Sequence, residues 1–305
     1  MVPRAAMSAA VVWSFSGDVV PWRSRQTRPA AEASPHPATT PRVALVTGST
    51  DGLGREVARR LAASGAHVII HGRNRERGLQ VVQDIQREGK GSARFFAADF
   101  ASLAQVRAFG DSVLHDYDHI DVLVNNAGIW LSGDRRTLSA DSVEMHFAVN
   151  YLAGYLLTRM LLPRLVAAAP SRIVNVSSGS QTAIRFDDVM LERGYSDARG
   201  YAQSKLAQVM FTVDLAEELA GRGVTVAALH PATYMNTTMV VSHDVTPQST
   251  VEEGAAAVLH LIDGADVLSG RYYVGLTPGR PNAQALDAAA RSQLRALSER
   301  LVKKN

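Results

Sequence analysis

Short apolar runs alternate along the chain with longer stretches in which apolar positions recur every three or four residues. The runs predict strands and the longer stretches predict helices. The expected strands are Val43–Thr47, His67–His71, Arg94–Ala98, Asp121–Asn125, Arg172–Ser177, Val224–His230 and Tyr272–Val274. The expected helices include Arg55–Ser64, Arg77–Glu88, Leu103–Tyr117, Val143–Ala168 and Tyr201–Ala220, the last of them stopped by Gly221.

The first six apolar runs do not alternate between apolar and polar residues, which is typical of strands covered on both faces. Strands that alternate with helices imply right-handed crossovers and a parallel sheet. Neither an internal repeat nor a linker interrupts the pattern after residue 42. The sequence therefore predicts a single α/β domain over residues 43–305, a Rossmann-type doubly wound parallel sheet with helices on both faces.

Residues 1–42 lack this pattern. They contain six prolines and no sustained periodicity, and the apolar piece Ala9–Trp13 is too short for a signal peptide. We expect a disordered N-terminal extension, with Met7 as an alternative start. The alternative is a transit-like segment, because the stretch is rich in arginine and poor in acidic residues.

Composition excludes several classes of protein. The chain is 46% hydrophobic and 20% charged, with a net charge of +3, as in ordinary globular proteins. Five arginines lie in the first 42 residues, so the rest is close to neutral and offers no surface for nucleic acid. No run is long enough to span a bilayer. The absence of cysteine excludes disulfides and a thiol nucleophile, and it favours a cytoplasmic protein without a metal site.

A glycine-rich loop lies between the first expected strand and the helix that follows. It reads Thr47-Gly-Ser-Thr-Asp-Gly-Leu-Gly54. Without a Cβ atom, Gly48 permits a tight turn, Gly52 lets the backbone approach a pyrophosphate, and Gly54 lets the helix pack closely on the strand. Because a helix N-terminus favours anions, the loop predicts a dinucleotide site.

A tyrosine and a lysine lie one helical turn apart in Tyr201-Ala-Gln-Ser-Lys205. A free phenol is a poor acid–base catalyst near neutral pH because its pKa is about 10. A neighbouring ammonium favours the phenolate and should lower the pKa of Tyr201. Tyr195 is a rival phenol, but the basic residue four positions later is Arg199, which could not serve as an equivalent lysine.

Together with Asn125–Gly128 and Asn175–Ser178, these motifs give the chain a clear resemblance. Residues 43–305 resemble a short-chain dehydrogenase/reductase. Within that superfamily the chain is most similar to the retinol-dehydrogenase-like branch, and the similarity is carried by Val149–Thr158, Tyr201–Ala207 and Ser292–Leu301. The resemblance implies an NAD(P)-dependent enzyme that interconverts a carbonyl compound and its alcohol.

The resemblance also implies the catalytic residues. Tyr201 would donate or accept the proton, and Lys205 would lower the pKa of Tyr201 and hold the nicotinamide ribose. Ser178, the second serine of the Asn-x-Ser-Ser pattern, would bind the substrate oxygen. Asn150 would support a water-linked proton relay. The interval between Ser178 and Tyr201 is longer than the family's commoner one and matches the insertion of the retinol-dehydrogenase-like branch.

The expected cofactor contacts follow the same resemblance. They are Gly48, Ser49, Thr50, Asp51, Gly52, Leu53, Gly54, Arg73, Asn74, Asp99, Phe100, Asn126, Ala127, Gly128, Tyr201, Lys205, Pro231 and Thr233. Asp99 could instead be an ordinary acidic residue at a helix N-terminus. The loop after the sixth strand departs from the family pattern, because Ala232 stands where glycine is usual and Thr237 only approximates the family's threonine. His230 is expected to end the strand and not to act as a catalyst.

The second expected strand ends without an acidic residue, in Ile70-His-Gly-Arg-Asn-Arg75. An NAD enzyme would place Asp or Glu there to bind the ribose hydroxyls. Arg73, with Arg75 as a second candidate, can instead bind a 2′-phosphate, so the sequence favours NADP over NAD. The alternative is a solvated loop arginine. Asp51 departs from this reading, because some NADP-preferring relatives carry a basic residue there.

Aromatic and methionine residues in the expected loops suggest a lipophilic substrate. They are Trp130, Leu131, Ile184, Phe186, Met190, Tyr234, Met235, Met239 and Val240, and they would serve equally as packing beneath a lid. We predict an NADP-dependent oxidoreductase acting on a lipophilic ketone or aldehyde and its alcohol. The alternatives are a catalytically silent dinucleotide-binding regulatory protein, and an epimerase or C=C reductase on the same scaffold. Nucleic acid is not an expected partner, and a homo-oligomer is compatible with the sequence.

Overall fold

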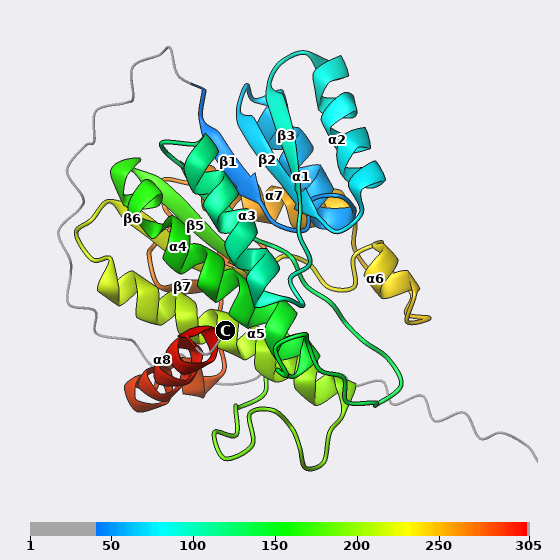
Figure 1. Ribbon diagram of the computed structural model, residues 1–305, viewed down its shortest axis with the longest axis vertical. Helices are drawn as coiled ribbons and strands as arrows, with labels where there is room; N and C mark the ends of the chain where they lie inside the picture. The colour runs from blue at the N-terminus through cyan, green and yellow to red at the C-terminus, as the bar shows by residue number, and fades with distance from the viewer. Residues whose placement is uncertain (1–40, 304–305) are drawn as a thin grey trace, which may run out of the picture. The chain divides into compact units, whose positions relative to one another are not determined.

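Eight strands form one sheet, in the order β3-β2-β1-β4-β5-β6-β7-β8, in the computed structural model, which describes residues 41–303 (Figure 1). All neighbouring pairs are parallel except β7 and β8. The strands are β1 Val43–Val46, β2 His67–Gly72, β3 Ser92–Ala97, β4 Val122–Asn125, β5 Ser171–Val176, β6 Val224–His230, β7 Arg271–Val274 and β8 Thr277–Pro278. The seven predicted strands and the α/β fold class are confirmed.

Helices cover both faces of the sheet, as predicted. Figure 1 shows α3, α4 and α5 in front of it and α1 and α7 behind it. Each face has its own hydrophobic core, because strand side chains alternate between the two layers. The helices are α1 Gly52–Ala63, α2 Arg75–Glu88, α3 Leu103–Asp116, α4 Ala153–Ala167, α5 Asp197–Glu218, α6 Thr238–Val241, α7 Val251–Asp263 and α8 Ala288–Lys303, with a π-helix η1 at Phe147–Leu152 and a 3-10 helix η2 at Ala283–Leu286.

Three expectations about the elements were wrong. Helix α5 begins at Asp197 and not at Tyr201, because the Ser196 side chain accepts the Arg199 N–H and caps the helix one turn earlier. Strand β3 is not covered on both faces, since it is the edge of the sheet and its residues are partly exposed. The short antiparallel strand β8 was not predicted.

The predicted N-terminal extension lies almost entirely outside the described residues, which begin at Pro41. Arg42, its last residue, belongs to the domain. The carbonyl oxygen of Arg42 accepts the His67 N–H at 2.9 Å, and its guanidinium lies 2.6 Å from the Asp263 carboxylate. The boundary of the α/β domain therefore lies before residue 42.

The strand order reverses between β1 and β4. From β1 the chain moves outward to β2 and β3, and from β4 it moves in the other direction through β5, β6 and β7. Ligands of open α/β sheets bind in the crevice at the carboxyl ends of the strands beside such a reversal. The segments that follow β1, β4, β5 and β6 carry the glycine loop, Asn126–Gly128, Ser178, Pro231 and Thr233. The other predicted site residues lie after β2 and β3, in η1 and in α5.

Candidate active site

The glycine-rich loop has the backbone geometry expected for close approach. Gly48 has a φ of +63°, and a Cβ atom there would lie 2.8 Å from Ala127 Cα. A Cβ on Gly54 would lie 2.4 Å from both Asn126 Nδ2 and Gly48 O. These positions exclude larger residues, so the loop, the start of α1 and the end of β4 form a narrow cradle.

Thr47 and Asn126 fasten this cradle to β4. The Thr47 hydroxyl accepts the N–H groups of Asn126 and Ala127, each at 3.0 Å. The Asn126 side chain donates to the carbonyl oxygens of Thr47 and Gly48 at 2.9 and 3.1 Å. Asn126 thus holds the glycine loop directly. The supporting role of Thr47 was missed by the sequence analysis, because a strand-ending threonine carries no signal of its own.

His71 and Ser49 support the cradle from β2. The buried Ser49 hydroxyl donates to Val46 O at 2.7 Å and accepts the His71 N–H at 3.0 Å. His71 Nδ1 accepts the Gly48 N–H at 3.1 Å, and burial lowers the pKa of His71 to about 3, so the ring is a neutral acceptor. Phe100 stacks on His71 with ring centroids 4.1 Å apart. The side chains of Ser49 and Phe100 therefore support the loop from within the core, although a cofactor contact was predicted for both.

Tyr201 lies close to both Ser178 and Lys205, and the catalytic roles expected of the three residues stay predictions. Burial raises the pKa of Tyr201, while a hydrogen bond with the Ser178 side chain acts in the opposite direction. The neighbouring Ser177 is buried, and its hydroxyl donates to Lys205 O at 2.7 Å. Ser178 is consequently the serine whose side chain faces the phenol.

The expected lowering of the Tyr201 pKa is wrong for the protein alone. Lys205 Nζ lies 5.7 Å from the centre of the Tyr201 ring and donates to Val176 O at 2.9 Å and to Gln208 Oε1 at 3.2 Å. Burial lowers the pKa of Lys205 itself to about 7. The Lys205 ammonium is directed toward neutral oxygens and not toward the phenol. Desolvation therefore determines the direction in which the pKa of Tyr201 shifts.

Asn150 lies in the π-helix η1 and holds the segment that follows β4. Its Oδ1 accepts the Ile129 N–H at 2.7 Å, and its Nδ2 donates to Ile129 O and to Ser204 Oγ. A Cβ on Gly128 would lie 3.3 Å from Asn150 Oδ1 and 3.4 Å from Lys205 Nζ. Asn150 Oδ1 and Lys205 Nζ thus both lie close to Gly128, while the predicted water-linked relay stays a prediction. Asn150 itself lies in a π-helix, a feature that is common at functional sites.

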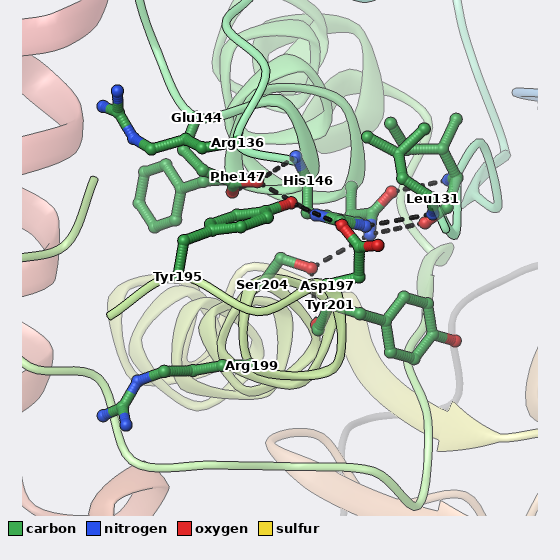
Figure 2. A network of polar contacts seen from close by, with 12 residues as sticks. Leu131, Arg136, Glu144, His146, Phe147, Tyr195, Asp197, Arg199, Tyr201 and Ser204 are labelled. Carbon is green, nitrogen blue, oxygen red and sulfur yellow. Dashed lines mark hydrogen bonds and ion pairs between the residues drawn. The ribbon is translucent and has the colours of Figure 1, made fainter. Parts of the chain in front are cut away.

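The buried side chains of Glu144 and His146, which the sequence analysis missed, support the loop that contains Ile129 and Leu131. In Figure 2, His146 lies between Glu144 and Leu131. His146 Nε2 accepts the Leu131 N–H at 3.2 Å, so its Nδ1 carries the proton that it donates to Glu144 Oε1 at 2.9 Å. Glu144 also accepts the N–H groups of His146 and Phe147. Asn150 and His146 therefore fix the backbone on either side of Trp130, whose ring lies 6.0 Å from that of Tyr201.

Tyr195 is held away from this chemistry. Its hydroxyl donates to Asp197 Oδ1 at 2.8 Å, and Figure 2 shows the phenol directed at that carboxylate. Burial and the Asp197 carboxylate both raise the pKa of Tyr195. Because the Tyr195 hydroxyl is hydrogen-bonded to a carboxylate, it is a poor proton donor for a substrate. Tyr201 is therefore the better candidate for the catalytic phenol.

Arg73 lies at the end of β2, beside the glycine loop. A Cβ on Gly72 would lie 2.6 Å from Thr50 Cγ2, so the two loops touch. The Arg73 side chain is exposed and has no hydrogen bond or ion pair with the residues of the described chain. Asn74 instead caps α2, because its side chain accepts the Arg77 N–H at 2.9 Å. A contact between Asn74 Oδ1 and the cofactor is therefore not favoured by this geometry.

A cavity of about 260 Å³ adjoins the glycine loop and is lined by two arginines, Arg55 and Arg77, which the sequence analysis missed. Its lining residues are Thr50, Asp51, Arg55, Arg77, Gln80 and Thr238. Arg77 lies 3.5 Å from the Asp51 carboxylate. Asp51 differs from the basic residue that some NADP-preferring relatives carry at this position. The Arg77 guanidinium, on the first turn of α2, partly neutralises the negative charge of Asp51.

Two other predicted contacts have local structural roles. Asp99 Oδ1 accepts the Ala101 N–H at 3.0 Å in the turn before α3. The N-cap of α3 is Ser102, so Asp99 does not stand at the helix N-terminus, as the alternative supposed. His230 ends β6, as expected, and its Nε2 lies 3.1 Å from the Thr233 hydroxyl. Pro231 and Thr233 follow β6 at the edge of the sheet that carries the glycine loop. Thr237 Cγ2 lies 3.3 Å from the position of a Cβ on Gly52, so the β6 loop reaches the cradle.

The nine predicted pocket residues divide into three groups. Ile184 and Val240 are buried, and Met235 packs against Gly254 of α7. Phe186 and Met190 line a separate cavity of about 440 Å³ beside α8. Trp130 and Tyr234 lie near Tyr201, while the carbonyl oxygens of Leu131 and of Met239 in α6 contact His243.

A doubly wound sheet with a glycine cradle beside its strand-order reversal defines a dinucleotide-binding protein. The tyrosine–lysine pair next to the cradle narrows the class to oxidoreductases. The chain belongs to the short-chain dehydrogenase family, because the family model described as short chain dehydrogenase matches residues 42–248. It is thus an NAD(P)-dependent oxidoreductase of alcohols and carbonyl compounds, in the retinol-dehydrogenase-like branch.

Known proteins show the same relationship. The chain is 36% identical to retinol dehydrogenase 11 of Homo sapiens over 80% of each chain. It is 36% identical to retinol dehydrogenase 13 of Homo sapiens over 88% of this chain and 87% of the relative. A solved short chain dehydrogenase from Shigella flexneri 2a str. 301, complexed with NADP, has a TM-score of 0.64 and 26% identity, covering 77% of this chain and 96% of the other.

Proposed function

We propose that this protein is an NADP-dependent oxidoreductase that interconverts a lipophilic ketone or aldehyde and its alcohol, with Ser178, Tyr201 and Lys205 as its site. The observation that carries the proposal is the meeting of a partly buried phenol, a serine hydroxyl and a buried lysine at the sheet edge that carries the glycine cradle. The relatives named as retinol dehydrogenases support a lipophilic substrate. The cytoplasmic location and a homo-oligomer stay predictions.

The residues present fit a dinucleotide cofactor. A Cβ at Gly48 or Gly54 would fill the cradle, and Arg73 is left without a protein partner in the described chain. The glycine loop and the start of α1 would hold the pyrophosphate, and Lys205 would hold the nicotinamide ribose. When bound, the nicotinamide supplies or accepts the hydride.

The protein's own part in the reaction is proton transfer and orientation. Ser178 would donate to the substrate oxygen, and the raised pKa of Tyr201 keeps the phenol protonated near neutral pH. Tyr201 can therefore give its proton to the oxygen of the carbonyl group as that group is reduced. In the opposite direction the phenol must first lose its proton, so alcohol oxidation should accelerate as pH rises.

A test of the reaction follows NADPH absorbance during a screen of carbonyl compounds graded in size and polarity. The proposal expects turnover that improves with apolar size. A protein that binds NADPH but reduces no compound in the screen would instead support the catalytically silent regulatory alternative. Spectral change in α,β-unsaturated ketones with no alcohol formed would favour a C=C reductase.

The choice of cofactor is tested at Arg73. We expect Arg73→Ala to weaken NADPH binding by about tenfold to a hundredfold, because a charge-assisted contact with a phosphate contributes roughly 1.5–3 kcal/mol. Binding of NADH, which lacks the 2′-phosphate, should change little. Both dissociation constants can be measured by fluorescence titration. Equal affinity of the wild type for the two cofactors would contradict the preference for NADP.

Arg77 offers a matched comparison for that experiment. It is an exposed arginine on the first turn of α2, but its guanidinium faces Asp51. If Arg73 is the main contact of the 2′-phosphate, Arg77→Ala should weaken NADPH binding less than Arg73→Ala. The reverse order would move the phosphate contact into the cavity between α1 and α2.

A further inference from the structure

Ser178 lies in an irregular segment whose shape depends on contacts with other parts of the chain. Residues 177–185, which follow β5, form neither helix nor strand. Such a backbone lacks the repeated hydrogen bonds of regular structure, so other partners must satisfy its N–H and C=O groups. At the start of the segment, Ser177 donates to Leu229 O of β6 and to Lys205 O of α5. Further partners come from the C-terminal part of the chain.

Tyr272 of β7 reaches the backbone of Ser178. Its hydroxyl donates to Ser178 O at 2.9 Å, and the residue is buried. Burial raises the pKa of Tyr272 to about 12, so the hydroxyl keeps its proton and stays a donor. The nearby Tyr201 contributes to the same shift. Tyr272 therefore contacts the backbone of Ser178 from beside the phenol of Tyr201.

Gln181 supplies a second donor to the same oxygen. Its Nε2 donates to Ser178 O at 2.9 Å, while its Oε1 accepts the Asn282 N–H at 2.9 Å. A carbonyl oxygen has two lone pairs, so both acceptor positions of Ser178 O are used. Ser178 Oγ accepts the Ser180 N–H at 3.1 Å, which leaves the hydroxyl proton to be donated. Both the peptide group and the side chain of Ser178 are thus held in place.

Gln284, in the 3-10 helix η2, pairs with the far end of the segment. Its Oε1 accepts the Ile184 N–H at 2.7 Å, and its Nε2 donates to Ile184 O at 3.1 Å. A neighbouring strand would make the same two bonds with its backbone, whereas here one side chain supplies both. Asn282 Oδ1 accepts the Gln284 N–H at 3.0 Å, so the contacts of Asn282 and Gln284 belong to one local structure.

We propose that Tyr272 is a positioning residue of the active site, and that with Asn282 and Gln284 it holds Ser178 where its hydroxyl meets both Tyr201 and the substrate oxygen. The proposal rests on the proposed function, in which Ser178 binds that oxygen. Tyr272 acts through the backbone of Ser178 and takes no part in proton transfer. Such positioning matters because a displacement of about 1 Å can lower a rate by about a hundredfold.

The first test is Tyr272→Phe, which keeps the ring and removes the donor to Ser178 O. We expect kcat/KM for carbonyl reduction to fall about tenfold, less than a full displacement would cost, because Gln181 still donates to the same oxygen. The dissociation constant of NADPH should stay close to that of the wild type, since the change is on the substrate side.

Tyr273→Phe is the matched control. Tyr273 is the next residue and is also buried, but its side chain lies in the core on the other face of the sheet. There its hydroxyl accepts the Leu268 N–H at 2.9 Å. Both changes remove one tyrosine hydroxyl and one hydrogen bond, so Tm should fall by a similar amount in the two variants. An equal loss of kcat/KM in Tyr273→Phe would overturn the proposal, because reduced stability would then explain both results.

The decisive comparison repeats Tyr272→Phe in a Ser178→Ala background. Ser178→Ala alone should lower kcat/KM about a hundredfold, as loss of an oxyanion donor does. Adding Tyr272→Phe should then cost less than about twofold more, because residues that act as one unit are not additive. A further loss of about tenfold in the double variant would show that Tyr272 acts independently of Ser178, and the proposal would be wrong.

Hydrogen exchange measures the same contacts without substrate or cofactor. Exchange of the Ile184 amide should accelerate about tenfold in Gln284→Ala, which removes its acceptor. Exchange of the Ser180 amide should accelerate in Tyr272→Phe, while Tyr273→Phe should change neither amide. Mass spectrometry of peptides that span residues 178–184 follows both positions. Wild-type exchange in Gln284→Ala and Tyr272→Phe would show that other contacts hold the segment, against the proposal.

The measurements separate the positioning role from the reaction. If no carbonyl compound is reduced, the proposed function fails, and hydrogen exchange decides whether the C-terminal residues hold the segment of Ser178. If compounds are reduced and Ser178→Ala lowers activity while Tyr272→Phe changes neither kcat/KM nor exchange, the positioning role is wrong and the proposed function stands.

Discussion

Tyr201→Phe is expected to lower kcat for carbonyl reduction by about 10²–10⁴-fold, the usual contribution of a positioned general acid. The change removes only the hydroxyl and keeps the partly buried ring, so packing against Trp130 and His146 should survive. The dissociation constant of NADPH should stay close to that of the wild type. Steady-state kinetics and a cofactor titration on the same preparation measure both effects.

Tyr195→Phe provides the matched control for this experiment. It removes a phenol hydroxyl six positions earlier in the chain, one that is bonded to Asp197. We expect kcat to change little and stability to fall modestly, because the Asp197 oxygen loses one donor. An inactive Tyr195 variant beside an active Tyr201 variant would reverse the catalytic assignment. Full activity in both variants would exclude a phenol from the proton transfer.

Most of the fold could be predicted because a parallel sheet has a strong sequence signature. Strands such as β1 and β4 are buried on both faces and appear as unbroken apolar runs. Strand β3 misled the analysis because an edge strand can contain apolar residues without being covered. Strand β8 has two residues, too few for any periodicity to show.

The glycine cradle and the tyrosine–lysine pair were predictable because both depend on spacing within one short segment. At Gly48 and Gly54 the neighbouring atoms leave no room for a Cβ atom. The glycines in the sequence therefore indicate directly where the backbone packs this closely. The pKa of Tyr201 was not predictable in the same way. Its direction depends on how deeply α5 buries the phenol and on where the Lys205 ammonium points, and both are tertiary properties.

The supporting contacts were missed because their partners are far apart in sequence or carry no motif. His243 meets Trp130 across more than a hundred positions, and Thr238 meets Asp51 across a still longer interval. The brace of His146 on Leu131 joins a helix to a loop through a ring nitrogen. A histidine in a sequence gives no sign of which of these roles it will have. Phe186 and Met190 show the converse error, since their apolar character suggested a substrate wall but their cavity lies beside α8.

Lys205→Met is expected to abolish most activity and yet to stabilise the protein without cofactor. The buried Lys205 ammonium has no carboxylate partner in the described chain and donates only to Val176 O and Gln208 Oε1. Its pKa is lowered from 10.5 to about 7, so the charged form is penalised in the folded state. An apolar side chain of similar length removes this penalty, as replacement of poorly compensated buried charges often does. Lys205 would then be retained for function at a cost in stability.

The pH dependence gives this prediction its sign. Between pH 7 and 10.5 the unfolded chain binds a proton at Lys205 that the folded chain does not, so wild-type stability rises with pH across that window. Stability is correspondingly lost as pH falls from 10.5 to 7, and the Lys205 contribution changes no further below pH 7. Without cofactor, Lys205→Met should therefore gain most near pH 6, on the order of 2 kcal/mol or roughly 4–8 °C in Tm. The gain should shrink toward pH 10.

Lys90→Met, at an exposed lysine, should show no such trend. Saturating NADPH should reverse the order, because only the wild type retains the ammonium that we propose binds the ribose, and ligand binding stabilises the folded state. A variant less stable than the wild type at pH 6 would show that the ammonium stabilises the fold, and the argument from desolvation would be wrong.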